Sequence, residues 1–191
     1  MSRPKNKEEY RQVLADAFAH VLEEKGLEWK KEWAAYGSQA APYNGVTKAR
    51  YRGSNAFYLS LLCMIHGYDD PRWVTMVQIM DKDRKYHPKE KWHLQAGSKA
   101  VWVEYWFPYD LVNKKAVTWE QYKTALTSGG RDETEFRLST RYTPVFNASL
   151  VEGMPPLEQE SKQTERHVQP DLLLSILSEN MGIELRYDGG D

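Results

Sequence analysis

Cationic and aromatic side chains that could hold a nucleic acid lie close together in one segment of this sequence. No aspartate or glutamate occurs between Glu32 and Asp69, and this acid-free window contains Lys48, Arg50 and Arg52 with tyrosines interleaved. A basic track neutralises phosphates, and aromatic faces stack on unpaired bases with about 1–3 kcal/mol for each base. Chance clustering is the plainer explanation. The combination nevertheless favours a surface that meets a phosphate backbone.

Catalytic and metal chemistry has weaker support. The sequence has no HExxH, CxxC or glycine-rich phosphate-binding motif. Cys63 and His66 lie one helical turn apart, and His87 and His93 flank a charged segment, but these residues do not have the four-ligand spacing of structural zinc sites. We therefore assign no catalytic residue, no metal ligand and no cofactor, and expect a binding protein rather than an enzyme.

The chain has 191 residues and a mass of 22.3 kDa, which is enough for one domain with its own core. Hydrophobic residues make up 41% and charged residues 28%, proportions typical of globular chains. The single cysteine cannot close an intrachain disulfide, and no apolar run is long enough to span a bilayer. We expect a cytoplasmic protein without a membrane partner.

The net charge of −1 conceals an uneven distribution along the chain. Residues 42–106 carry ten basic and six acidic side chains, whereas residues 158–191 carry three and eight. A basic middle and an acidic C-terminal segment therefore cancel in the sum. A positive middle disfavours a protein that mimics DNA with a dense acidic surface.

Apolar periodicity predicts two main helices. The stripe over residues 10–22 has the i, i+3, i+4 spacing of a helix that ends at Gly26. A second helix is expected from an N-cap at Ser54 to Gly67. The segment 29–53 between them has no period and predicts a long irregular loop. Two further short helices are expected from capping-box spacing, which is present in Thr75 with Gln78 and in Thr118 with Gln121.

Strands are predicted in the second half of the chain. Residues 92–94 and 99–107 predict a hairpin turned at Gly97, and alternation over residues 136–143 predicts another strand. Side chains in a strand alternate between its two faces. Trp102 and Trp106 therefore share one face of their strand, and Arg137 and Arg141 share one face of theirs. If these two faces adjoin, they add cations and rings to the surface; the alternatives are core packing of the tryptophans and pairing of the arginines with Glu104.

A boundary is expected near residue 157, where Pro155 and Pro156 precede a polar run. We predict a domain over residues 1–157 and a linker with the start of a second unit over residues 158–191, including a helix over 172–181 and a strand over 183–187. The fold class is α+β: a small, mostly antiparallel sheet packed with several helices and a long irregular basic loop.

Several motifs occur in an order that identifies a family resemblance. They are the run from Pro42 through Tyr43-Asn44-Gly45 and Thr47-Lys48-Ala49-Arg50-Tyr51-Arg52 to Asn55, then Gly67 to Thr75 with Gln78, Gly97-Ser98-Lys99 before the strand over 101–106, and Tyr142 to Asn147 with Gly153. Together these blocks resemble the N-terminal domain of ArdC-type antirestriction proteins over residues 29–157. Where the family commonly has Thr-Gly-Lys, this chain has Thr47-Lys48-Ala49.

The resemblance implies an α+β domain that binds single-stranded DNA with little sequence preference, in proteins carried by plasmids and other mobile elements. In that family a zincin-like metallopeptidase domain follows, and residues 170–191 look like its beginning. We therefore expect this chain to be the N-terminal portion of a longer protein, with peptidase chemistry in the part that follows.

The expected partner is single-stranded DNA, and the alternative is a protein-interaction module that docks onto a restriction or DNA-transfer complex. A metal-dependent nuclease is the least supported hypothesis, because no carboxylate cluster is found in the sequence. The sequence leaves the oligomeric state open. The predicted DNA-binding residues are Tyr43, Asn44, Thr47, Lys48, Arg50, Tyr51, Arg52, Asn55, Arg72, Trp73, Gln78, Lys99, Trp102, Trp106, Arg137 and Arg141.

Overall fold

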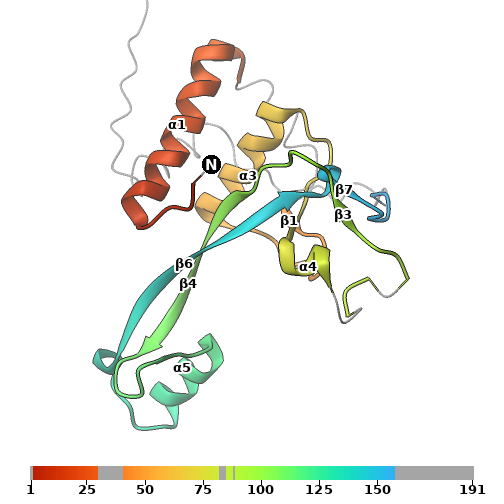
Figure 1. Ribbon diagram of the computed structural model, residues 1–191. Coiled ribbons are helices and arrows are strands. Elements are labelled where there is room, and N and C mark those ends of the chain that lie inside the picture. Colours follow the sequence, from red (N-terminus) through yellow and green to blue (C-terminus); the bar gives the residue numbers. More distant parts are fainter. Residues whose placement is uncertain (1, 30–40, 82–84, 88, 158–191) are drawn as a thin grey trace, which may run out of the picture.

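A computed structural model describes residues 2–29, 41–81, 85–87 and 89–157. The fold is α+β, as predicted, and is built on a curled, mostly antiparallel sheet of five strands in the order β1-β2-β6-β4-β5 (Figure 1). Only the β1–β2 pair is parallel. A separate small sheet pairs β3 with β7. The strands are β1 (Tyr43–Asn44), β2 (Arg72–Thr75), β3 (His93–Leu94), β4 (Val101–Asp110), β5 (Lys115–Ala116), β6 (Phe136–Asn147) and β7 (Val151–Glu152).

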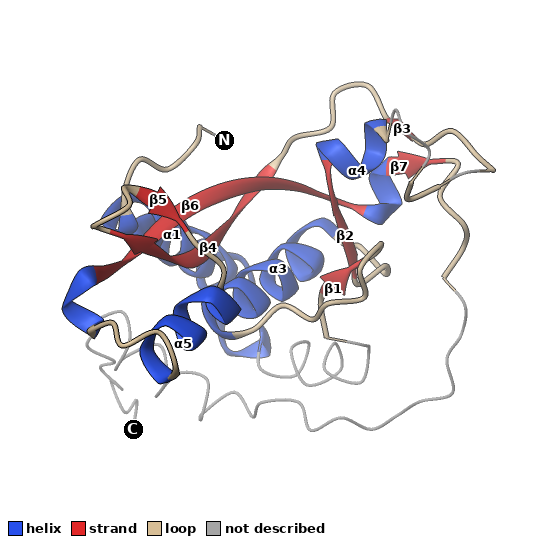
Figure 2. Ribbon diagram, turned by 90° about the horizontal axis from the view of Figure 1, so that it is seen from below, coloured by secondary structure: helices blue, strands red, loops and turns tan. Residues whose placement is uncertain are grey.

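Helices α1 (Lys7–Lys25) and α3 (Gly53–His66) pack against each other beside the sheet (Figure 2). Their buried faces meet the strands in a core that includes Tyr10, Tyr58 and Trp73. The C-terminal glycines predicted for both helices, Gly26 and Gly67, are their C-caps. The shorter helices are η1 (Gly26–Glu28), α4 (Met76–Met80), α5 (Trp119–Thr127), η2 (Glu133–Glu135) and η3 (Ala148–Leu150). No helix in the described ranges is both long and apolar enough to cross a membrane.

Several local predictions are confirmed and others are wrong. Both capping boxes, at the start of α4 and of α5, are present. The N-cap of α3 is Arg52 rather than Ser54, and its side chain makes no capping hydrogen bond. The hairpin turned at Gly97 does not form, because β3 pairs with β7 and β4 pairs with β6. The segment 29–53, in its described part, contains the two-residue strand β1. The elements predicted over 172–187 lie outside the described residues.

Strands β4 and β6 extend beyond the helices as a long two-stranded ribbon, which ends at α5 (Figure 1). We call residues 105–141 the arm. At the far end of the arm, Arg131 donates hydrogen bonds to both oxygens of Asp110 and to Glu135. Hydrogen bonds from this guanidinium and from Asn113 hold the pKa of Asp110 well below its usual value, although burial of the carboxyl acts in the opposite direction.

The lowered pKa of Asp110 predicts an acid-dependent contribution to stability. A carboxyl with a depressed folded-state pKa stabilises the fold above its unfolded pKa near 4, and this contribution is lost as the pH falls toward the folded value. We expect Asp110→Asn to lower the urea midpoint at pH 7, and the difference from wild type to shrink between about pH 5 and pH 2. Urea denaturation followed by circular dichroism at several pH values tests this, and a difference that is constant with pH contradicts it.

Candidate nucleic-acid interface

Residues 42–53, which lie within the acid-free window of the sequence, form a hydrogen-bonded turn that we call the basic loop. The Tyr51 backbone N–H donates to the Pro42 carbonyl at 2.9 Å, and the Asn44 N–H donates to the Ala49 carbonyl at 2.8 Å. A third bond runs from the Lys48 N–H to the Asn44 carbonyl at 2.9 Å. These backbone bonds fix the path of the loop and leave its tip at residues 47–50 exposed.

Asn44 and Gln78 hold the basic loop in shape through side-chain hydrogen bonds. Their side-chain amides form a reciprocal pair, with N···O distances of 3.1 and 3.0 Å. The Asn44 Oδ1 atom also accepts from the backbone N–H groups of Val46 and Thr47, and the Gln78 Oε1 atom accepts from the Thr75 N–H. These two predicted site residues therefore hold the loop in shape, and Gln78 is buried.

The exposed side chains of the loop combine charge with aromatic surface. Thr47, Lys48, Arg50 and Arg52 are exposed, and Tyr43 and Tyr51 are half-buried, with Tyr51 packed against the core. The Lys48 Nζ atom lies 5.6 Å from the centre of the Tyr43 ring. Lys48 and Arg52 form no ion pair with a carboxylate of the described residues. Burial raises the pKa of Tyr51, so this ring is neutral at pH 7.

Lys48 occupies a backbone conformation that favours glycine. Its φ is 60°, in the left-handed region, which costs a residue with a Cβ atom about 1–2 kcal/mol. This is the position at which the resembled family commonly has glycine. Lys48 therefore places a cation at the tip of the loop in a strained backbone conformation.

We expect Lys48→Gly to be more stable than Lys48→Ala by about 1 kcal/mol, because only glycine relieves the positive φ. Both variants remove the charge and should lose equal affinity for an anionic ligand. Thermal unfolding compares the stabilities, and an alanine variant as stable as the glycine variant would show that the loop carries no strain at this residue.

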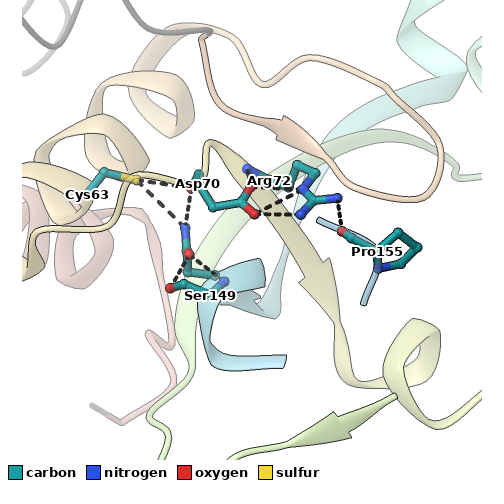
Figure 3. A network of polar contacts seen from close by, with 6 residues as sticks. Cys63, Asp70, Arg72, Ser149 and Pro155 are labelled. Carbon is teal, nitrogen blue, oxygen red and sulfur yellow. Dashed lines mark hydrogen bonds and ion pairs between the residues drawn. The ribbon is translucent and has the colours of Figure 1, made fainter. Parts of the chain in front are cut away.

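Arg72 is in a buried ion pair and does not face solvent. Its guanidinium donates to both carboxylate oxygens of Asp70, with a shortest N···O distance of 2.6 Å, and to the Pro155 carbonyl at 2.8 Å (Figure 3). The buried Asn147 side chain donates to the Asp70 carbonyl at 2.8 Å and accepts from Ser149. We call this set the Arg72 network. It fixes β2, against which β1 and the basic loop are built.

Trp73 and Asn55 also have internal roles. Trp73 is 1% exposed and lies in the core, so its ring is not available for stacking on a base. The Asn55 amide donates to the Glu104 carbonyl at 2.7 Å and accepts from the Glu104 N–H at 2.9 Å. Its oxygen also accepts from the Tyr10 hydroxyl at 2.7 Å. Asn55 therefore joins the start of α3 to the middle of β4 and to α1.

The predicted face that would combine Trp102 and Trp106 with Arg137 and Arg141 does not exist. In the β4–β6 register, Arg141 lies opposite Tyr105, whereas Trp106 lies opposite Thr140. Directly opposed residues share a face, so the arginines and the tryptophans are on opposite faces of the ribbon.

The two faces also differ in what covers them. Trp102 packs against the core, and the Trp106 indole N–H donates to the Glu104 carboxylate at 2.8 Å. Arg137 and Arg141 are exposed. They do not pair with Glu104; their guanidinium groups lie over the rings of Tyr109 and Tyr105 instead. The sequence-based site omitted these two tyrosines, and only the strand register could have placed them under the arginines.

Lys99 is exposed in the segment before β4 and forms no ion pair within the described part of the chain. The structure thus separates the predicted site residues into two groups. Those with exposed or half-buried side chains on the basic loop, in the segment before β4 or on the arm are Tyr43, Thr47, Lys48, Arg50, Tyr51, Arg52, Lys99, Arg137 and Arg141. Those with internal contacts are Asn44, Asn55, Arg72, Trp73, Gln78, Trp102 and Trp106. The described residues include no group of three or more metal-ligating side chains.

The chain is similar in sequence to two bacterial proteins. Two Escherichia coli relatives, each named DNA primase TraC, are 25% identical over 162 residues and 26% identical over 168 residues. These matches cover 82% and 85% of this chain but 14% and 11% of the relatives, so the chain spans a small part of their length.

Two solved structures of antirestriction ArdC protein from the R388 plasmid are also similar. The metal-free structure is 19% identical, with a TM-score of 0.48, over 76% of this chain and 42% of that one. The Mn(II)-bound structure is 20% identical, with a TM-score of 0.46, over 84% and 46%. A family model described as the N-terminal domain of anti-restriction factor ArdC matches residues 8–146. Since this match spans most of the chain and includes the basic loop, α3 and the arm, the protein belongs to the ArdC N-terminal domain family.

Proposed function

We propose that this domain binds single-stranded DNA with little sequence preference, in an antirestriction or mobile-element context. The observation that carries the proposal is the exposed cationic surface of the basic loop: Lys48 and Arg52 are exposed and pair with no described carboxylate, and Lys48 lies beside the Tyr43 ring. Membership of the ArdC N-terminal family and the DNA primase name of the two relatives support a role on DNA.

The proposed mechanism is binding without catalysis. The loop cations neutralise phosphates, and Tyr43 and Tyr51 offer ring surface on which an unpaired base stacks. In this proposal Thr47, Arg50 and Lys99 extend the polar and cationic surface, while Asn44 and Gln78 keep the loop in its binding shape. A duplex buries its bases in the stack, so the ring contacts favour a single strand.

Fluorescence anisotropy with a labelled oligonucleotide at two salt concentrations tests the proposal. We expect binding at low salt, a steep loss of affinity at high salt, and weaker binding to a duplex of the same sequence. Failure to bind at low salt, or a preference for duplex, would refute it. Arg50→Glu with Arg52→Glu separates the alternative role: DNA binding collapses if the loop holds DNA, whereas docking onto a protein complex can survive the change.

A further inference from the structure

The outer face of the arm carries a row of rings and guanidinium groups that we call the arginine ladder. Its residues are opposed in the β4–β6 register: Tyr105 faces Arg141, and Tyr109 faces Arg137. Phe107 lies between the two tyrosines on the same face. The Arg141 guanidinium carbon is 4.6 Å from the Tyr105 ring centre and 6.0 Å from that of Phe107, and the Arg137 carbon is 4.9 Å from that of Tyr109.

The cations of the ladder are exposed and are not neutralised by the described chain. Arg137 and Arg141 form no ion pair there, and the Tyr105 side chain is 45% exposed. Nearby carboxylates are engaged elsewhere. Asp110 and Glu135 bind Arg131, and Glu104 accepts from Trp106 and from Tyr142 on the opposite face. The ladder is therefore a positively charged face with planar groups turned to solvent.

The opposite face of the ribbon is already occupied. The N-terminal residues Arg3, Pro4 and Lys5 line one pocket together with Thr140 and Tyr142, and Lys7 lies 5.4 Å from the centre of the Trp106 ring. Along the ladder, in contrast, Tyr105, Arg137 and Arg141 are exposed, and Phe107 and Tyr109 are half-buried. The two guanidinium groups on this face are therefore accessible to a ligand.

We propose that the arginine ladder is a base-stacking surface for single-stranded DNA, separate from the basic loop. The inference rests on the proposed function and adds a second contact region to it. A guanidinium that covers a ring on one side presents its other plane to a base, while its N–H edge donates to a phosphate. Charge complementarity favours this polyanion over an apolar partner, and planar groups favour unpaired bases over a duplex.

The two surfaces are joined through Asn55. The basic loop ends at Gly53, where α3 begins, and Asn55 hydrogen-bonds both backbone groups of Glu104, the residue that precedes Tyr105. From Tyr105 to Tyr109, β4 extends about 13 Å, at about 3.3 Å for each residue. A DNA strand that contacts both the basic loop and the arginine ladder must be longer than one that contacts the loop alone. The proposal therefore predicts a dependence of affinity on oligonucleotide length.

The test compares Arg137→Gln/Arg141→Gln with wild type in the 191-residue chain, using a short and a long oligothymidine and a long base-free sugar–phosphate chain. We expect the double variant to lose about tenfold in affinity for the long oligothymidine, and much less for the short oligomer and the base-free chain.

The matched control is Lys115→Gln/Lys123→Gln. It removes two exposed cations of the arm that lie off the ladder, since Lys115 is opposed to Asp110 and Lys123 is on α5.

Failure of the proposed function and failure of the ladder proposal give different results in this test. If wild type binds no oligothymidine, the proposed function fails together with the ladder. If wild type binds and the ladder variant matches the control variant, only the ladder proposal fails. Arg137→Lys/Arg141→Lys keeps the charge without the plane, so full recovery of affinity would overturn base stacking. A changed oligomeric state with unchanged DNA affinity would make the ladder an interface between copies of the chain, and would also overturn the proposal.

Discussion

Replacing Lys48 and Arg52 together by glutamate should lower the affinity for single-stranded DNA at least about 100-fold at low salt. Both side chains are exposed and pair with no described carboxylate, so their charge is available to phosphates. The glutamates replace attraction with repulsion at the same two positions. Because neither side chain is buried, we expect the thermal unfolding temperature to change little.

The neutral variant Lys48→Gln/Arg52→Gln gives a quantitative form of the same prediction. On a single strand, each phosphate contact contributes about 0.7 to the slope of log affinity against log salt. Removing two contacts should therefore reduce the slope by about 1.4. The control is Lys115→Gln/Lys123→Gln, which changes one residue of β5 and one of α5. A slope equal to that of wild type would show that the loop does not contact the backbone.

The second large effect concerns stability. Asp70→Ala should destabilise the domain by about 3–5 kcal/mol, because it leaves the Arg72 guanidinium buried without its carboxylate. The two side chains are only 8% and 15% exposed, so solvent cannot replace the lost partner. The loss also reaches the interface, since Arg72 is in β2, which pairs with β1 at the base of the basic loop. Urea denaturation measures the free energy of unfolding.

A double variant distinguishes the cost of an unpaired charge from the value of the pair. Asp70→Leu/Arg72→Met removes both ions and keeps apolar volume, and we expect it to be more stable than Asp70→Ala. If Asp70→Ala costs less than 1 kcal/mol, the pair does not hold β2 in place. Anisotropy on the same variants should show weaker binding for Asp70→Ala, since the loop loses its support.

The local signals in the sequence predicted much of the fold. Apolar spacing located α1 and α3, and the pairs Thr75/Gln78 and Thr118/Gln121 form the predicted capping boxes. These features depend on residues close together in the chain. The basic loop was likewise visible as an acid-free window, although β1 within it was not, because a two-residue strand has no period of its own.

The features that sequence reasoning missed depend on distant residues. The Gly97 hairpin was wrong because β3 finds its partner in β7, and β4 finds its partner in β6. Alternation placed Trp102 and Trp106 on one face and Arg137 and Arg141 on one face. It could not say which faces adjoin, because a shift of one residue in register exchanges them. For the same reason, the sequence alone could not place the rings of Tyr105 and Tyr109 beside Arg141 and Arg137.

The long ribbon of β4 and β6 has an unusual amount of unpaired strand edge. Among the described strands, β4 has only β6 beside it from Val101 to Pro108, and β6 has only β4 beside it from Phe136 to Pro144. Such edges invite other chains to add strands and form aggregates. Here each strand contains a proline, which has no N–H to offer, and the Asn55 amide occupies both backbone groups of Glu104 in the way a neighbouring strand would. These residues leave fewer backbone groups on the ribbon edges free to pair with a strand of another chain.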